Sequence, residues 1–360
     1  MTDFMVIDII NYEKSFAGKN ILITGGMGFI GSNLALRIAG LNPENPARIM
    51  IVDSLVDGLG GSWKNIRGIE KKAELYLGSE WNIGNIARMK KLIKDADFIF
   101  NLAGSAKHTG LNEKDLKFDT EINFISQILF LEAVRQIITE NKEKKISIVF
   151  TGTRDQYGKV PENDLPVKED YLPKKMADYQ SISKNAVEQH HLILNDFPNI
   201  KACSARITNT YGERQSVKTN AVVPVFIKKA LNNEIIELWG GGEVLRDFNY
   251  IDDVVDALLL LAVSEKTAGE FYNLGCCIFK NNEKRIFGNN LATIKNLAEK
   301  IVEIAGKGEI KIIPYPSDRK SVEPGHFAAD ISKIAGLGWT PKTSLEDGLR
   351  KTIEWVRENE

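Results

Sequence analysis

Three glycines near the N-terminus have the spacing of a dinucleotide-binding turn. Gly25, Gly28 and Gly31 lie in TGGMGFIGS, after the apolar run 19–24 and at the start of a helical pattern. Glycines here permit a tight turn and let a pyrophosphate approach the N–H groups that open the helix. Asp53 ends the next apolar run, 22 residues after Gly31, where a carboxylate binds both ribose hydroxyls and repels a 2′-phosphate. A glycine turn without a ligand is the alternative, but this order of elements favours bound NAD.

Alternating elements must position this turn. Apolar runs alternate with helical patterns, which predicts parallel strands joined by crossover helices. Alternation within the runs is weak, as expected for strands buried on both faces. The fold class predicted is α/β, a Rossmann-type doubly wound parallel sheet. Strands are expected at 19–24, 48–53, 97–102, 146–151 and 200–207, and helices at 32–39, 86–94, 121–139 and 177–195.

The pattern changes after about residue 208, where loops lengthen and become polar. We expect a smaller C-terminal α/β domain that binds the substrate and covers a cleft. Its helices are predicted at 221–231, 252–264, 291–305 and 345–358, with Ser344 and Asp347 capping the last one. The expected division is an N-terminal extension at 1–18, a cofactor domain at 19–207 with about 247–273, and a substrate domain at 208–246 and 274–360.

The composition excludes several classes of protein. The 360 residues include 47 Lys and Arg against 48 Asp and Glu, so no polybasic surface for nucleic acid or membrane is indicated. The longest apolar run, 257–263, is too short to cross a bilayer. Cys203, Cys276 and Cys277 cannot form a disulfide framework, which favours a reducing, cytoplasmic compartment. No cluster has metal-ligand spacing, so no metal is expected.

Five motifs in order carry a family resemblance: ITGGMGFIGSNLA, FNLAG, SxSKxxxE, RITNTYGERQ and RDFNYIDDVVDA. The chain resembles the extended short-chain dehydrogenase/reductase family, more narrowly its NAD-dependent epimerases and dehydratases of nucleotide sugars. The resemblance implies tightly held NAD and a small domain that binds a nucleoside diphosphate. It also implies that a sugar carbon, usually C4, loses a hydride to NAD⁺ and later regains it, with a keto-sugar in between.

The resemblance also implies further cofactor contacts. They come from the glycine turn and from the end of the 97–102 run: Phe29, Ile30, Leu102, Ala103 and Gly104. Lys184 matches the family's helix lysine, whose ammonium binds the nicotinamide ribose and lowers nearby pKa values. Thr153 matches the hydroxyl that binds the reacting sugar hydroxyl.

The sequence departs from the family at the catalytic tyrosine, which lies four residues before the lysine. Gln180 occupies that position, and Tyr179 is one residue earlier. On a helix, Tyr179 and Lys184 are about 140° apart around the axis, so the tyrosine should point away. The Gln180 amide can bind a hydroxyl but cannot act as a general base near neutral pH.

Three interpretations remain for the missing base. Another group serves, and Asp155 is the best candidate, with Lys107 and His108 as further options. Alternatively, a local distortion recruits Tyr179. The third interpretation is a protein that binds cofactor and sugar nucleotide but has lost its chemistry.

Two charged residues after Thr153 bear on the reaction type. In the family's 4,6-dehydratases an Asp–Glu pair follows the threonine, and in 4-epimerases these positions are usually uncharged. Here Arg154 replaces the Asp and Asp155 matches the Glu. A base at this position favours elimination slightly, with a simple 4-epimerase as the alternative. The class expected is an isomerase or a lyase.

The resemblance assigns the nucleotide site to the second half of the chain. Arg246 and Arg319 match arginines that bind the diphosphate, a role that suits two guanidinium groups. The other substrate contacts expected are Lys107 and Asn209, with Val223, Pro224 and Trp239 lining the pocket for the nucleotide base. The resemblance also implies a homodimer, in which the helices at 121–139 and 177–195 pair with those of a second copy. His190 and His191 are expected on the helix surface.

Overall fold

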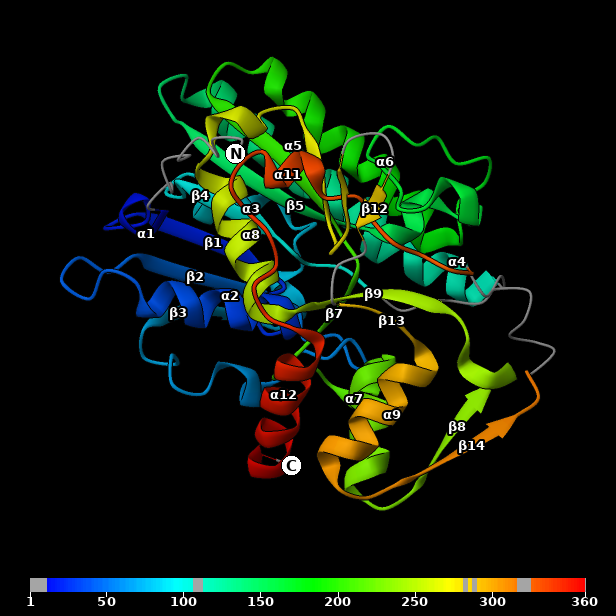
Figure 1. Ribbon diagram of the computed structural model, residues 1–360. Helices are drawn as coiled ribbons and strands as arrows, with labels where there is room; N and C mark the ends of the chain where they lie inside the picture. Colours follow the sequence, from blue (N-terminus) through cyan, green and yellow to red (C-terminus); the bar gives the residue numbers. More distant parts are fainter. Residues whose placement is uncertain (1–11, 106–112, 281–283, 287–289, 316–324, 360) are drawn as a thin grey trace, which may run out of the picture.

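The computed structural model describes residues 12–105, 113–280, 284–286, 290–315 and 325–359. A seven-stranded parallel sheet forms its centre, in the order β10-β6-β5-β4-β1-β2-β3 (Figure 1). Its strands are β1 Asn20–Thr24, β2 Arg48–Asp53, β3 Ala73–Leu77, β4 Phe98–Asn101, β5 Ile146–Thr153, β6 Ile200–Ile207 and β10 Phe271–Leu274. The sheet confirms the predicted fold class. β3 and β10, at its two edges, were not predicted.

Helices cover both faces of the sheet. They are α1 Tyr12–Ser15, α2 Phe29–Gly40, α3 Ile86–Ile93, α4 Glu113–Asp119, α5 Ser126–Glu140, α6 Tyr179–Ile193 and α8 Ile251–Val263. Helices α2 and α8 pack together on one face, and α3, α5 and α6 lie on the other. Side chains of β1 alternate between two apolar cores, because Ile21 and Ile23 face α2 whereas Leu22 faces α3 and α5.

The helical stretch that contains the predicted helix at 121–139 begins earlier in the structure than predicted. Helix α4 precedes it, and a π-helical turn, Thr120–Ile125, joins α4 to α5. This stretch, Glu113–Glu140, has the length and hydropathy of a membrane-crossing helix, and half of its most apolar window is buried inside the protein. A core helix passes the same test, and its packing against α3 and α6 accounts for the apolar side.

The part of the chain described before β1 belongs to the core. Phe16 follows α1 and is fully buried, with its ring 4.8 Å from that of Phe98 and 6.4 Å from that of Phe100. Phe16, which lies within the predicted extension at 1–18, therefore packs into the core. An apolar residue in a polar stretch gave too weak a signal to place it there.

Three small sheets lie beside the main one. Their strands are β7 Asn209–Tyr211, β8 Ile235–Trp239, β9 Leu245–Tyr250, β11 Ile278–Lys280, β12 Lys284–Ile286, β13 Leu291–Thr293 and β14 Glu309–Ile313. β13 and β7 flank β9, β14 pairs with β8, and β11 pairs with β12. The helices of this region are α7 Val222–Leu231, α9 Ile294–Ala305, α11 Ser332–Ala335 and α12 Leu345–Asn359.

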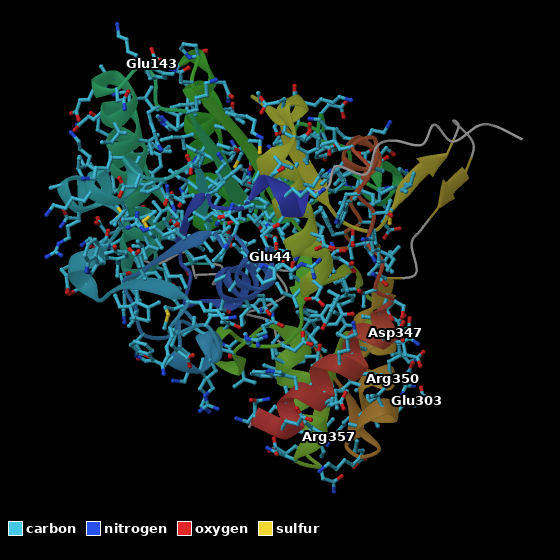
Figure 2. The ribbon with its side chains drawn as sticks, turned by 90° about the vertical axis from the view of Figure 1, so that its left-hand side faces the viewer. Glu44, Glu143, Glu303, Asp347, Arg350 and Arg357 are labelled. Atoms are coloured by element: carbon cyan, nitrogen blue, oxygen red, sulfur yellow. The ribbon has the colours of Figure 1, made fainter. Side chains whose placement is uncertain are left out.

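Helix α12 closes the chain against this region. Ser344 accepts the Asp347 N–H at 3.1 Å, which is half of the predicted capping box. Figure 2 shows Asp347, Arg350 and Arg357 along α12, with Glu303 of α9 close by. The Arg357 guanidinium donates to the last-turn carbonyl of α9, Ala305 O, at 2.9 Å. Helix α12 therefore covers α9 with a charged outer face and an apolar inner face.

Candidate active site

The glycine turn is shaped so that a side chain would block it. A Cβ on Gly31 would lie 2.4 Å from the carbonyl oxygen of Gly25, and a Cβ on Gly25 would lie 2.9 Å from the backbone of Ala103. Gly25 also has φ +68°, which side chains rarely adopt. Gly28 caps α2 without a side-chain hydrogen bond, which leaves the first-turn N–H groups to an anion. These features fit the pyrophosphate of a dinucleotide.

Asp53 lies at the end of β2, as predicted. Its carboxylate accepts the N–H of Met27 at 3.1 Å and that of Leu55 at 2.8 Å. These bonds fix the side chain beside the glycine turn, and burial raises its pKa. The predicted ribose contact requires this position, because the second strand must carry the carboxylate to the adenosine side of the turn.

The end of β4 is held against the glycine turn. Thr24 donates to Asn101 Oδ1 at 2.7 Å and accepts the N–H groups of Leu102 and Ala103 at 3.1 Å each. Gln127 of α5 donates to the Ala103 carbonyl at 2.6 Å. The predicted cofactor-binding backbone therefore lies directly beside the turn that would bind the pyrophosphate.

Lys184 on α6 faces this backbone. Its ammonium donates to the Thr151 carbonyl at 2.9 Å, and a Cβ on Gly104 would lie 3.6 Å from Nζ. Burial lowers the pKa of Lys184 to about 8, against the charges of Asp119 and Glu188, which raise it. The ammonium therefore lies where a nicotinamide ribose bound along β4 would meet it.

The lowered pKa of Lys184 predicts a pH dependence of stability. Between pH about 8 and 10.5 the unfolded chain binds a proton at this lysine that the folded chain does not, so stability rises with pH there. Lys184→Met has no such charge to bury. In urea unfolding of NAD-free protein, Lys184→Met should exceed the wild type most at pH 7.5, and the gap should narrow by pH 10. A gap independent of pH would contradict the buried ammonium.

Thr153 and Asp155 form a hydrogen-bonded pair at the end of β5. The Thr153 hydroxyl donates to Asp155 Oδ2 at 2.9 Å, and Asp155 is 5% exposed. The turn that follows holds them, because the Thr153 N–H donates to the side chain of Gln156 at 2.8 Å. A hydroxyl bonded to a carboxylate can pass a proton from a third group to that carboxylate.

Gln180 points into the site and Tyr179 begins the helix. Asp178 caps α6 by accepting the Ser181 N–H at 2.9 Å, which makes Tyr179 the first helical residue. The Gln180 amide donates to the Ser105 carbonyl at 3.0 Å, and its Oε1 is buried with no hydrogen-bond partner among the described residues. Gln180 can therefore receive a donor such as a sugar hydroxyl.

Sequence reasoning missed the π-helical turn as part of the site. Asn123 in this turn accepts the Ser105 N–H at 2.8 Å and donates to the Ser105 carbonyl at 3.2 Å. It also donates to Asp119, which accepts the Ser183 hydroxyl at 2.8 Å. A π-helical turn often marks a functional site, and here it fixes the backbone that Gln180 contacts. The helical pattern of 121–139 gave no signal for it.

Arg154 is buried beside the Thr153–Asp155 pair. It is 8% exposed, and its guanidinium stacks over Phe327 at 5.2 Å. Asp155 Oδ1 lies 3.7 Å from its Nη2, which is longer than a hydrogen bond. Burial raises the pKa of Asp247 to about 6, and the charge of Arg154 opposes that shift. Both residues are buried, so they do not form a solvated ion pair on a surface loop.

The predicted substrate residues are spread over the second half of the chain. Arg246 is buried on β9 and donates to the carbonyls of Leu245 and Gly325. Asn209 starts β7, and its Oδ1 is buried with no partner in the described chain. The predicted residues Lys107, His108 and Arg319 lie outside the described residues.

The residues predicted to line the base pocket lie in two different environments, one buried and one exposed. Val223 and Pro224 are buried in α7, where packing in the core accounts for them. Trp239 at the end of β8 is 41% exposed, and its ring lies edge-on to Tyr315 at 5.8 Å. An exposed indole beside a second aromatic ring is suited to stacking on a base.

Two groups of titratable residues lie in the interior of the protein. The prediction that His191 lies on the helix surface is wrong, because its ring is fully buried and stacks on Phe150 at 4.4 Å. Burial lowers the pKa of His191 to about 4. Among the described residues, Asp247, Cys276 and Cys277 bring their ligand atoms within 4.8 Å of one another. The Asp247 carboxylate accepts two backbone N–H groups, and the contact with Cys277 together with burial raises the pKa of the Cys276 thiol. These bonds account for the cluster as part of the packed interior.

The fold and the site define a class: a dinucleotide-dependent enzyme with a lysine, a hydroxyl and a carboxylate beside the cofactor turn. The model of the NAD dependent epimerase/dehydratase family matches residues 21–275, and the chain belongs to this family. NAD is its cofactor, and it belongs to the NAD-dependent nucleotide-sugar epimerases and dehydratases.

Similar proteins include both reaction types. A putative UDP-glucose 4-epimerase of Methanocaldococcus jannaschii is 29% identical over 94% of this chain and 99% of its own length. A dTDP-glucose 4,6-dehydratase of Shigella flexneri is 28% identical over 94% of this chain and 93% of its own. Among solved structures, the UDP-glucose 4-epimerase of Thermotoga maritima with UDP-glucose has 27% identity and a TM-score of 0.76, covering 94% and 99% of the two chains.

Proposed function

We propose that the chain inverts C4 of a nucleoside-diphosphate sugar through a bound keto-sugar. The observation that carries this is the 2.9 Å hydrogen bond from the Thr153 hydroxyl to Asp155. Thr153 would accept the proton of the sugar's C4 hydroxyl while passing its own to Asp155, which replaces the base that Gln180 cannot supply. Bound NAD⁺ supplies the acceptor for the C4 hydride.

The other residues position the sugar and hold charge. The ammonium of Lys184 lies beside the cofactor backbone and would favour loss of a proton from nearby hydroxyls. The unpartnered Oε1 of Gln180 would accept a hydrogen bond from the sugar. Return of the proton from Asp155 through Thr153, with hydride addition to the other face of the ketone, gives the C4 epimer without net redox.

The geometry shifts the balance from elimination towards epimerisation. Asp155 is bonded to Thr153 and so serves the C4 hydroxyl. Arg154 stands where elimination would need an acid, and a guanidinium does not donate a proton at working pH. Product analysis of UDP- and dTDP-hexoses tests the proposal: the C4 epimer is expected, and loss of water would refute it.

We propose that 19–207 with 247–273 binds NAD and that 208–246 with 274–360 binds the nucleotide sugar, with Asn209, Arg246, Arg319 and Trp239 in contact with it. Arg246 and the exposed indole of Trp239 support the second assignment. The three free, buried cysteines fit a cytoplasmic protein.

We also propose a homodimer through α4, α5 and α6. Apolar side chains remain exposed on these neighbouring helices: Leu116, Ile125, Leu129, Ile182 and Ile193. Helices α5 and α6 pack side by side (Figure 1), and we propose that these exposed side chains share one face of the pair. A second copy of this face would cover them.

Ile182→Asp is expected to convert the dimer to a monomer, because it places a charge in the proposed apolar interface. Analytical ultracentrifugation at micromolar concentration measures the change. The matched control is Ile312→Asp, a similarly exposed isoleucine on β14, which should leave the mass unchanged. A dimer that tolerates Ile182→Asp would place the interface elsewhere.

A further inference from the structure

We propose that Arg154 binds a carboxylate on the sugar next to the reacting carbon. The preferred substrate is then a nucleoside-diphosphate hexuronic acid, not a neutral hexose. This inference rests on the proposed function for the position of the reacting carbon. It deepens that function by naming the class of sugar.

The guanidinium of Arg154 has hydrogen-bonding capacity to spare. A guanidinium carries five N–H donors in a planar fork. Among the described residues, its contacts are the face of Phe327 at 5.2 Å and one carboxylate oxygen, Asp155 Oδ1, at 3.7 Å. Neither contact is a hydrogen bond. Arg154 is 8% exposed, and a buried cation whose N–H donors lack acceptors is stabilised when an anionic ligand binds to it.

The position of Arg154 in the site indicates which part of a bound nucleotide sugar it would contact. Thr153, the next residue, marks the reacting C4 hydroxyl. Phe327, beneath the guanidinium, is two residues from Gly325, whose carbonyl Arg246 binds at the proposed diphosphate end. Arg154 therefore lies between the reacting carbon and the diphosphate, on the sugar itself. Of the two ring carbons next to C4, C5 is the one that bears an exocyclic carbon, C6, which is a carboxylate in hexuronic acids.

The charge balance fits the same ligand. A C6 carboxylate near Asp155 would be repelled in a poorly hydrated site. Arg154 lies 3.7 Å from Asp155, so a guanidinium between the two carboxylates would weaken the repulsion between them. Stacking on Phe327 holds the planar fork, which is the geometry that binds a carboxylate with two parallel bonds.

The test compares two nucleotide sugars that differ only at C6, with the free nucleotide as a reference. Affinities of UDP, UDP-glucose and UDP-glucuronate for the NAD-loaded protein are measured by calorimetry, with the dTDP series in parallel because the base is not assigned. The wild type is expected to bind the glucuronate at least tenfold more tightly than the glucose form in the series it accepts. A preference below twofold in both series overturns the proposal.

Three variants locate the preference. Arg154→Met should abolish it and leave the affinity for the glucose form within about threefold. Arg154→Lys keeps the charge without the fork and should retain part of it. Arg350→Met, which removes an exposed arginine of α12, should leave all affinities unchanged. If Arg154→Met weakens UDP alone as much as UDP-glucuronate, the group bound is the diphosphate and the proposal is wrong.

The outcome is separable from that of the proposed function. Inversion of UDP-glucose at C4 without preference for the uronate would leave the function standing and refute this inference. Selective binding of UDP-glucuronate without C4 inversion would do the reverse. The wild-type comparison decides even if Arg154→Met fails to fold.

Discussion

Replacing Asp155 with asparagine is expected to lower turnover by about 10²–10⁴-fold while bound NAD is retained. Asp155 Oδ2 is the acceptor of the Thr153 hydroxyl, and an amide at this position cannot take up a proton. The loss should fall on kcat, because the side chain contacts Thr153 and not the nucleotide. Initial rates with saturating sugar nucleotide, and the absorbance of bound cofactor, measure both parts.

The control for Asp155→Asn is Asp164→Asn, which removes an exposed carboxylate in the loop after β5 and should retain wild-type turnover. Asp155→Asn removes the carboxylate beside the buried Arg154, and thermal melting checks that this change has not unfolded the site. Thr153→Val combined with Asp155→Asn should cost little more than either change alone, since both break one relay. Turnover of Asp155→Asn within threefold of the wild type would remove Asp155 from the proton path.

Gly31→Ala should abolish stoichiometric NAD binding. The new Cβ would lie 2.4 Å from Gly25 O and 2.7 Å from Gly26 Cα, and both are backbone atoms that cannot rotate away. Helix α2 must then move from the turn that would bind the pyrophosphate, at a cost of about 1–3 kcal/mol from overpacking alone. We expect NAD affinity to fall at least tenfold, measured by cofactor content after desalting and by titration.

Gly40→Ala is the matched control, because it makes the same substitution at the end of the same helix. A Cβ on Gly40 meets nothing within 4 Å. Its cofactor content and melting temperature should equal or exceed those of the wild type. If Gly31→Ala retained full NAD, the glycine turn would not be the pyrophosphate site.

The central strands were predictable because local pattern and burial agree there. The predicted ranges for β2 and β6 match the structure, since each is an apolar run buried on both faces. Asp53 was also predictable, because the end of a strand fixes where its last side chain lies. β3 and β10 were missed because their sequences, AELYL and FYNL, mix polar with apolar residues.

The contacts that complete the site could not be read from the sequence. Asn123 reaches Ser105 across 18 residues of chain, through a π-helical turn that carries an ordinary helical pattern. Burial of Arg154 depends on Phe327, more than 170 residues away. His191 was misplaced because one polar residue on a helix gives no sign that a strand residue stacks on it.

The most direct measurement of the account is product analysis in deuterated water. The purified protein is incubated with UDP- and dTDP-hexoses and hexuronates, and the products are examined by mass spectrometry and NMR. The C4 epimer is expected at unchanged mass and without deuterium on carbon, because the C4 hydrogen leaves and returns as a hydride and the proton on Asp155 returns to oxygen. Loss of one water, or deuterium at C5, would contradict it and make Asp155 the base for a carbon-bound proton.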